Sequence, residues 1–123
     1  SNFSLDSIEP PGSISVRPGT TTSAGVTVPN LVINWTPSPT PATQKYRLYA
    51  KVNGGNPILL TETTGLSFEY IDTPEADFLF SVVAVAFSGR ESTPTSIIHH
   101  LIGSGGVAVP PNTIRMVDEP SNT

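Results

Sequence analysis

The chain has 123 residues, of which 37% are hydrophobic and 13% charged, and its formal net charge is -4. This size fits one domain with tails, no apolar run approaches the roughly 18 residues of a membrane-spanning helix, and the negative charge gives no general attraction for nucleic-acid phosphates or anionic membranes. The absence of cysteine from the sequence excludes disulfides and thiolate metal sites, so stability must come from apolar burial and backbone pairing.

Thirteen prolines and ten glycines interrupt the sequence and predict short strands in place of long helices. In the first thirty residues, only residues 14–16 and 26–28 alternate, which predicts a short edge strand and a second weak strand. The first firm strand is residues 31–35, which places Leu31, Ile33 and Trp35 on a core face.

Residues 45–52 have the clearest alternation in the chain. One face is apolar and the other carries Lys45, Arg47, Tyr49 and Lys51. The Asn-Gly-Gly-Asn turn at residues 53–56 predicts residues 58–63 as a hairpin partner. Residues 66–71 should form the next strand, with Phe68 and Tyr70 on one face.

The last two predicted strands are apolar on both faces. In residues 78–85, one face has Phe78, Phe80, Val82 and Ala84, and the other has Leu79, Ser81, Val83 and Val85. In residues 96–102, Ile97 and Leu101 lie opposite Ile98 and Ile102. The core covers only one face of such a strand, so some other part of the protein or a partner must cover the other face.

About seven short strands, each with an apolar face to bury, predict an all-β fold: a seven-stranded antiparallel β-sandwich in which two sheets face each other. We expect an N-terminal tail at residues 1–12, the domain at 13–103, and a Gly- and Pro-containing linker toward a following domain at 104–123. The start lacks an initiator Met and a signal segment, so we expect a fragment of a longer chain.

Several segments resemble fibronectin type III domains. Residues 31–37, with Trp35, look like the second strand of that family, and residues 46–49 look like its third. Residues 78–84, followed by the loop 89–92, are similar to its sixth strand and the loop after it. The resemblance covers roughly residues 10 to 103 and implies that the sandwich is of the fibronectin type III, immunoglobulin-like type.

Two features depart from the family's pattern. The family has Tyr where Phe78 stands, so the corner hydrogen bond of a tyrosine hydroxyl is absent and packing alone must hold that corner. The stretch between Val16 and Leu31 is longer than usual, which leaves the pairing of the first strand open.

Residues 97–103, leading to Val-Pro-Pro at 109–111, resemble domain junctions of bacteriophage tail-tip host-specificity proteins of the J type. This resemblance implies a virion tail component involved in host attachment. Secreted bacterial enzymes also carry such domains as spacers, so an extracellular spacer or carbohydrate-presenting module of a hydrolase stays open as the alternative.

No residue is predicted to be catalytic, to bind a cofactor or to bind a metal. His99 and His100 are the only histidines, and neighbours on a strand point to opposite faces, so they cannot share one ion. Asp72, Glu75 and Asp77 lack the EF-hand pattern and predict a solvated turn. The serines have no Gly-x-Ser-x-Gly elbow.

The sequence therefore predicts association with neighbouring domains or subunits of the same assembly or with a host receptor, but not with nucleic acid or a membrane interior. The candidate interface is the outer face of the third, sixth and seventh strands, with Tyr49, Leu79, Val83, Val85, Ile98 and His100. Gly89, Arg90 and Glu91 form a candidate recognition loop, although the integrin-binding tripeptide of some family members is absent. Val83→Lys should then weaken association without unfolding the monomer.

Overall fold

The structure is a computed structural model that describes residues 7–101. It has seven strands and no helix in this range: β1 (Ile14–Ser23), β2 (Val26–Trp35), β3 (Thr43–Val52), β4 (Ile58–Thr63), β5 (Ser67–Ile71), β6 (Ala76–Ala86) and β7 (Thr95–Leu101). No helix within this range is long and apolar enough to cross a membrane. The predicted linker at residues 104–123 and Ile102 lie outside the described residues.

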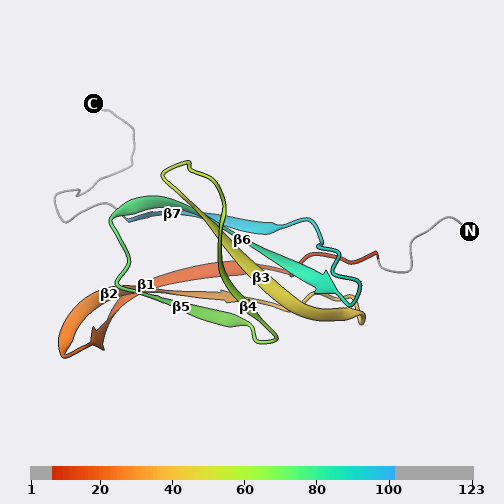
Figure 1. Ribbon diagram of the computed structural model, residues 1–123, viewed down its shortest axis with the longest axis horizontal. Helices are drawn as coiled ribbons and strands as arrows, with labels where there is room; N and C mark the ends of the chain where they lie inside the picture. Colours follow the sequence, from red (N-terminus) through yellow and green to blue (C-terminus); the bar gives the residue numbers. More distant parts are fainter. Residues whose placement is uncertain (1–6, 102–123) are drawn as a thin grey trace, which may run out of the picture.

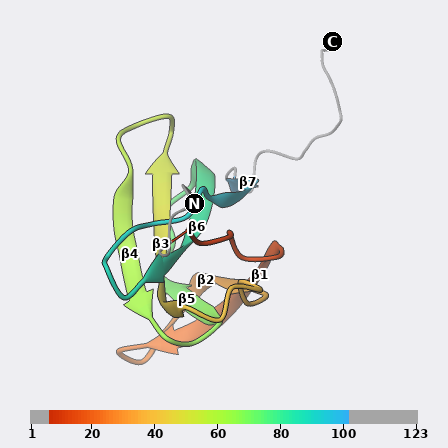
Figure 2. The ribbon, with the colours of Figure 1, turned by 90° about the vertical axis from the view of Figure 1, so that its right-hand side faces the viewer.

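The strands form two antiparallel sheets that face each other (Figures 1 and 2). One sheet has three strands in the order β1-β2-β5, and the other has four in the order β4-β3-β6-β7. The predicted all-β, seven-stranded antiparallel sandwich is therefore confirmed.

The first two strands differ from the prediction. The predicted segment 14–16 is the start of a longer strand, and the predicted segments 26–28 and 31–35 belong to one strand. Together β1 and β2 form one long hairpin in which Ile14 pairs with Trp35 and Ser23 with Val26. The turn residues Ala24 and Gly25 both have positive φ, as a two-residue hairpin of type I′ requires. Much of this hairpin extends past β5, which pairs with β2 only from Asn30 to Asn34. The extended part has little apolar alternation, so the sequence pattern did not predict it.

The core lies between the two sheets and contains the residues that alternation predicted. Trp35 is buried, and its ring packs against that of Tyr46 with the ring centroids 6.2 Å apart. Phe78 stacks on Phe80 with the ring centroids 5.2 Å apart. It also packs against Tyr70 in a T-shaped arrangement with the centroids 5.8 Å apart. Two aromatic rings thus pack against Phe78.

The described part of the predicted N-terminal tail is attached to the domain. Ile8 packs against the core, and the backbone of Glu9 exchanges hydrogen bonds with the hydroxyls of Thr40 and Ser38 at 2.9 and 2.7 Å. The Thr95 hydroxyl donates to the carbonyl of Pro11 at 2.5 Å. The chain therefore enters the sandwich in a fixed position beside the start of β7.

Candidate functional site: a groove on the outer face of the four-stranded sheet

The outer face of the four-stranded sheet is built by strand register. Tyr49 pairs with Ser81, and Lys51 pairs with Leu79, which in turn pairs with Ile98 on β7. Since paired residues project to the same side of a sheet, these side chains lie together on the face that points away from the core.

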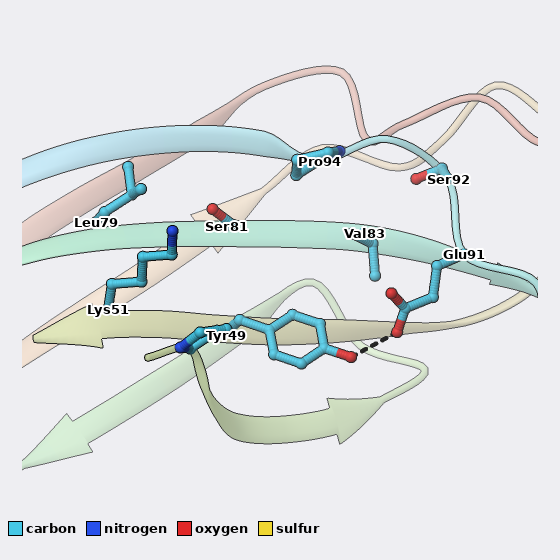
Figure 3. A pocket seen from close by; sticks show the side chains of 9 residues that line it. Tyr49, Lys51, Leu79, Ser81, Val83, Glu91, Ser92 and Pro94 are labelled. Atoms are coloured by element: carbon cyan, nitrogen blue, oxygen red, sulfur yellow. Dashed lines mark hydrogen bonds between the residues drawn. The ribbon is translucent and has the colours of Figure 1, made fainter. Parts of the chain in front are cut away.

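An open groove of about 410 Å³ runs along this face (Figure 3). Leu79 and Val83 from β6 lie between Tyr49 and Lys51 on one side and Pro94 on the other, and Glu91 closes one end. Most of the exposed lining is apolar. Its lining residues are Tyr49, Lys51, Pro57, Leu79, Ser81, Val83, Glu91, Ser92 and Pro94.

Ion pairs organise the Glu91 end of the groove. Arg47 donates through Nε to Glu62 Oε2 at 2.7 Å and through Nη1 to Glu91 Oε2 at 2.9 Å. Lys45 Nζ adds a contact to Glu62 at 3.1 Å. One arginine on β3 thereby links the edge strand β4 to the loop that follows β6.

The same contacts lower the pKa values of the Glu62 and Glu91 carboxyl groups. Hydrogen bonds from Arg47 and Lys45 lower the pKa of Glu62. Burial opposes the ionisation of Glu91, but hydrogen bonds from Tyr49 and Arg47 and the charge of Arg47 outweigh it and lower its pKa.

Tyr49 points along the groove, and its hydroxyl donates to Glu91 Oε2 at 2.5 Å. This hydrogen bond, followed by burial and the charge of Glu91, raises the pKa of the Tyr49 phenol. The ring is therefore held as one wall of the groove in its neutral form.

Two of the predicted interface residues are buried or nearly so. Val83 is 5% exposed and Val85 is 0% exposed. The loop after β6 turns back over this end of the strand, where Glu91 bridges Val85, and Arg47 is paired beside Val83. The prediction that Val85 offers contact area is wrong, and Val83 offers only the small part that reaches the groove, because this domain itself covers the outer side of both valines.

The other four predicted interface residues remain on the outer face. Tyr49 and Leu79 line the groove, while Ile98 is 64% exposed on β7. The ring of His100 lies beside Asp77, with Nδ1 at 2.8 Å from Oδ1. The accessible face thus begins at Tyr49 and extends toward the C-terminal end of β7.

A second hollow of about 200 Å³ continues this face. Lys51 and Leu79 line both hollows, and Asp77, Gly54 and Ile98 line the second one. Within residues 7–101, Lys51 makes no ion pair. An exposed cation therefore lies between two hollows that are mostly apolar.

The predicted recognition loop is braced against β6. Gly89 has a φ of 92°, which suits glycine, and its N–H donates to the carbonyl of Ala86 at 2.9 Å. The Ala86 N–H donates in turn to the Arg90 carbonyl at 3.0 Å. Ser92 receives a hydrogen bond at its hydroxyl from the N–H of Ala84 at 2.9 Å. The Glu91 carboxylate accepts hydrogen bonds from Arg47 and Tyr49, so it holds the loop against β3.

Sequence reasoning missed Leu59 as part of this face. A bulge at Leu48/Tyr49 shifts the register, so that Tyr49 pairs with Leu59 and Leu60 packs against the core. Leu59 is 50% exposed. Without the bulge, strict alternation would point Leu59 toward the core and Leu60 toward the outer face. No residue pattern in β4 reveals the bulge. Phe87, which is 76% exposed in the loop after β6, was also not predicted.

The two histidines point to opposite faces of β7, as predicted, and the structure shows that His99 is half-buried and His100 exposed. Burial, and then the charge of His100, lowers the pKa of His99. Among residues 7–101, no three His, Cys, Asp or Glu side chains come together as a metal site.

No protein-family profile matches the chain, and no curated protein matches it significantly. Among solved structures, the chain is similar to a fibronectin type III domain of human collagen XX, with a TM-score of 0.56 and 21% identity. The match covers 81% of this chain and 98% of that domain. The chain therefore has a fibronectin type III-like fold, and at this identity the likeness supports the fold alone.

Proposed function

We propose that this domain is a non-catalytic association module of a phage or prophage tail-tip host-specificity protein, with a role in tail assembly or host attachment. The observation that carries the association role is the groove beside Leu79, with Tyr49, Leu59 and Ile98 around it. A contiguous exposed apolar surface on a small domain is typical of an interaction site.

The groove's chemistry favours binding over catalysis. The carboxylate of Glu91 is occupied by Arg47 and Tyr49, and the hydroxyl of Ser81 is 2.8 Å from that of Ser96. Nucleophilic catalysis needs a base within reach of a hydroxyl, and no histidine is among the residues that line the groove. Its side chains can instead provide apolar contact, a cation and an aromatic wall.

The tail-tip assignment is supported by the resemblance of residues 97–103 and 109–111 to the domain junctions of such proteins. Immunogold labelling tests it directly. Antibodies against the chain should label the distal tail of phage particles released by bacteria that encode it, and antibody preabsorbed with the chain should not. Recovery of the chain only in the culture supernatant, joined to a hydrolase, would instead establish the spacer role.

A further inference from the structure

We propose that the surface formed by Lys51, Asp77, Leu79 and Ile98 binds a second copy of this chain through a two-fold symmetric contact. The inference rests on the proposed association role but not on the tail-tip assignment. Figure 3 shows Lys51 and Leu79 side by side on the outer face, at the end of the groove opposite Glu91.

The first argument is shape. Ile98 is 64% exposed and lies beside the hollow that Lys51, Gly54 and Asp77 help to line. A projecting side chain next to a hollow of about 200 Å³ is self-complementary, because a two-fold partner can place its own isoleucine against this hollow. The paired positions of Leu79 and Ile98 put both residues near the centre of such a contact.

The second argument is charge. Lys51 is exposed and makes no ion pair within the described chain. The Asp77 side chain is 58% exposed, and its Oδ1 lies 2.8 Å from Nδ1 of the exposed His100. Both residues line the second hollow, at neighbouring positions around Leu79. In a symmetric interface residue i meets residue j while j meets i. A two-fold axis in the plane of this face, passing between Lys51 and Asp77, therefore sets each lysine opposite the other copy's aspartate.

A second copy accounts for this pattern better than an acidic or basic partner does. A purely acidic partner would satisfy Lys51 but would face Asp77 with a like charge, and a basic partner would have the converse problem. A copy of the same surface supplies the cation, the anion and the apolar centre together.

Sedimentation equilibrium on the full chain tests this inference. The wild type should approach twice the monomer mass as its concentration rises from about 10 µM to about 1 mM, the range of a weak contact. Lys51→Asp and Asp77→Lys, each alone, face like charges twice across the two-fold axis. Each should weaken self-association about tenfold or more.

An equimolar mixture of the two variants is the decisive sample. In the mixed dimer, the introduced aspartate of one copy faces the introduced lysine of the other at one contact. The original Lys51 and Asp77 face each other at the second contact, so association should return.

Two matched variants control for net charge. Arg17→Asp on the other sheet and Glu75→Lys in the turn before β6 carry changes of the same sign and should associate like the wild type. Circular dichroism verifies that all four variants are folded.

Three results would overturn the proposal. A wild type that stays monomeric at every concentration would leave this face to residues 102–123 or to a foreign protein. A mixture no stronger than its components would exclude the paired charges. Equal weakening by the control variants would reduce the effect to net charge. None of these results bears on immunogold labelling of the tail, so the two proposals can fail separately.

Discussion

At the scale of single residues, Arg47 joins several parts of the outer face. It connects β4 to the loop after β6 through Glu62 and Glu91, and it lies beside Val83. Exposed ion pairs stabilise a fold by roughly 1 kcal/mol or less, so its main effect is to hold the loop in position. This position decides which residues of β6 are covered and which are left to form the groove.

Because Val83 is buried and Leu79 lines the open groove, the same substitution should cost much more stability at Val83 than at Leu79. Val83→Lys places an ammonium where the side chain is 5% exposed, and it should lower the free energy of unfolding by about 3 kcal/mol or more. Leu79→Lys on the groove should cost less than about 1 kcal/mol. Urea denaturation of both variants measures the difference, and equal losses would show that the loop leaves Val83 open.

The hydrogen bond between Tyr49 and Glu91 gives a titration that can be measured. Because Glu91 raises the pKa of Tyr49, Glu91→Gln should bring it down toward the ordinary value for tyrosine. Ultraviolet difference titration against Tyr49→Phe isolates this phenol from the other two tyrosines. An unchanged Tyr49 titration in Glu91→Gln would mean that the carboxylate does not accept the bond in solution.

At the scale of elements, the β1–β2 hairpin depends on its turn. Ala24 has a φ of 52° and Gly25 one of 78°, a region that costs about 1 kcal/mol for a residue with a Cβ. Ala24→Gly should therefore stabilise the domain by a few tenths to about 1 kcal/mol, and Gly25→Ala should destabilise it by about 1 kcal/mol. Thermal unfolding measures both variants, and a gain for Gly25→Ala would contradict this turn geometry.

Elements that obey simple alternation could be predicted from the sequence. The inner faces of β3 and β6 were predicted residue by residue, because a period of two and a buried face leave one arrangement for Leu48 or Phe80. The exchange of Leu59 and Leu60 could not be predicted, since a bulge depends on the pairing of two strands. The sequence also could not predict that the loop after β6 covers Val83 and Val85. This loop is held by contacts of its Glu91 with β3 residues that are more than forty positions earlier in the chain.

For the whole molecule, the half-buried His99 on the edge strand β7 makes stability depend on pH. The folded state lowers the pKa of His99, so the unfolded chain binds a proton more readily. The stability associated with a neutral His99 is fully present above the unfolded pKa of about 6.5 and is lost as pH falls through the lower folded value. The free energy of unfolding should thus decrease below about pH 6.5.

His99→Gln should reduce this dependence, and His100→Gln on the exposed face serves as the control. Urea unfolding at a series of pH values measures it. A wild-type curve that stays flat between neutral pH and about pH 5, where the unfolded imidazole is protonated, would contradict the burial of His99.

Association of this sandwich through the outer face of β3, β6 and β7 can be tested residue by residue. The measurement is a dilution series of the full chain followed by two-dimensional ¹H–¹⁵N NMR. We expect concentration-dependent shifts around Lys51, Asp77, Leu79 and Ile98, with the core and the β1–β2 hairpin unchanged. Shifts centred on Phe87 and the loops at the opposite end of β6, or no shifts at any concentration, would contradict it.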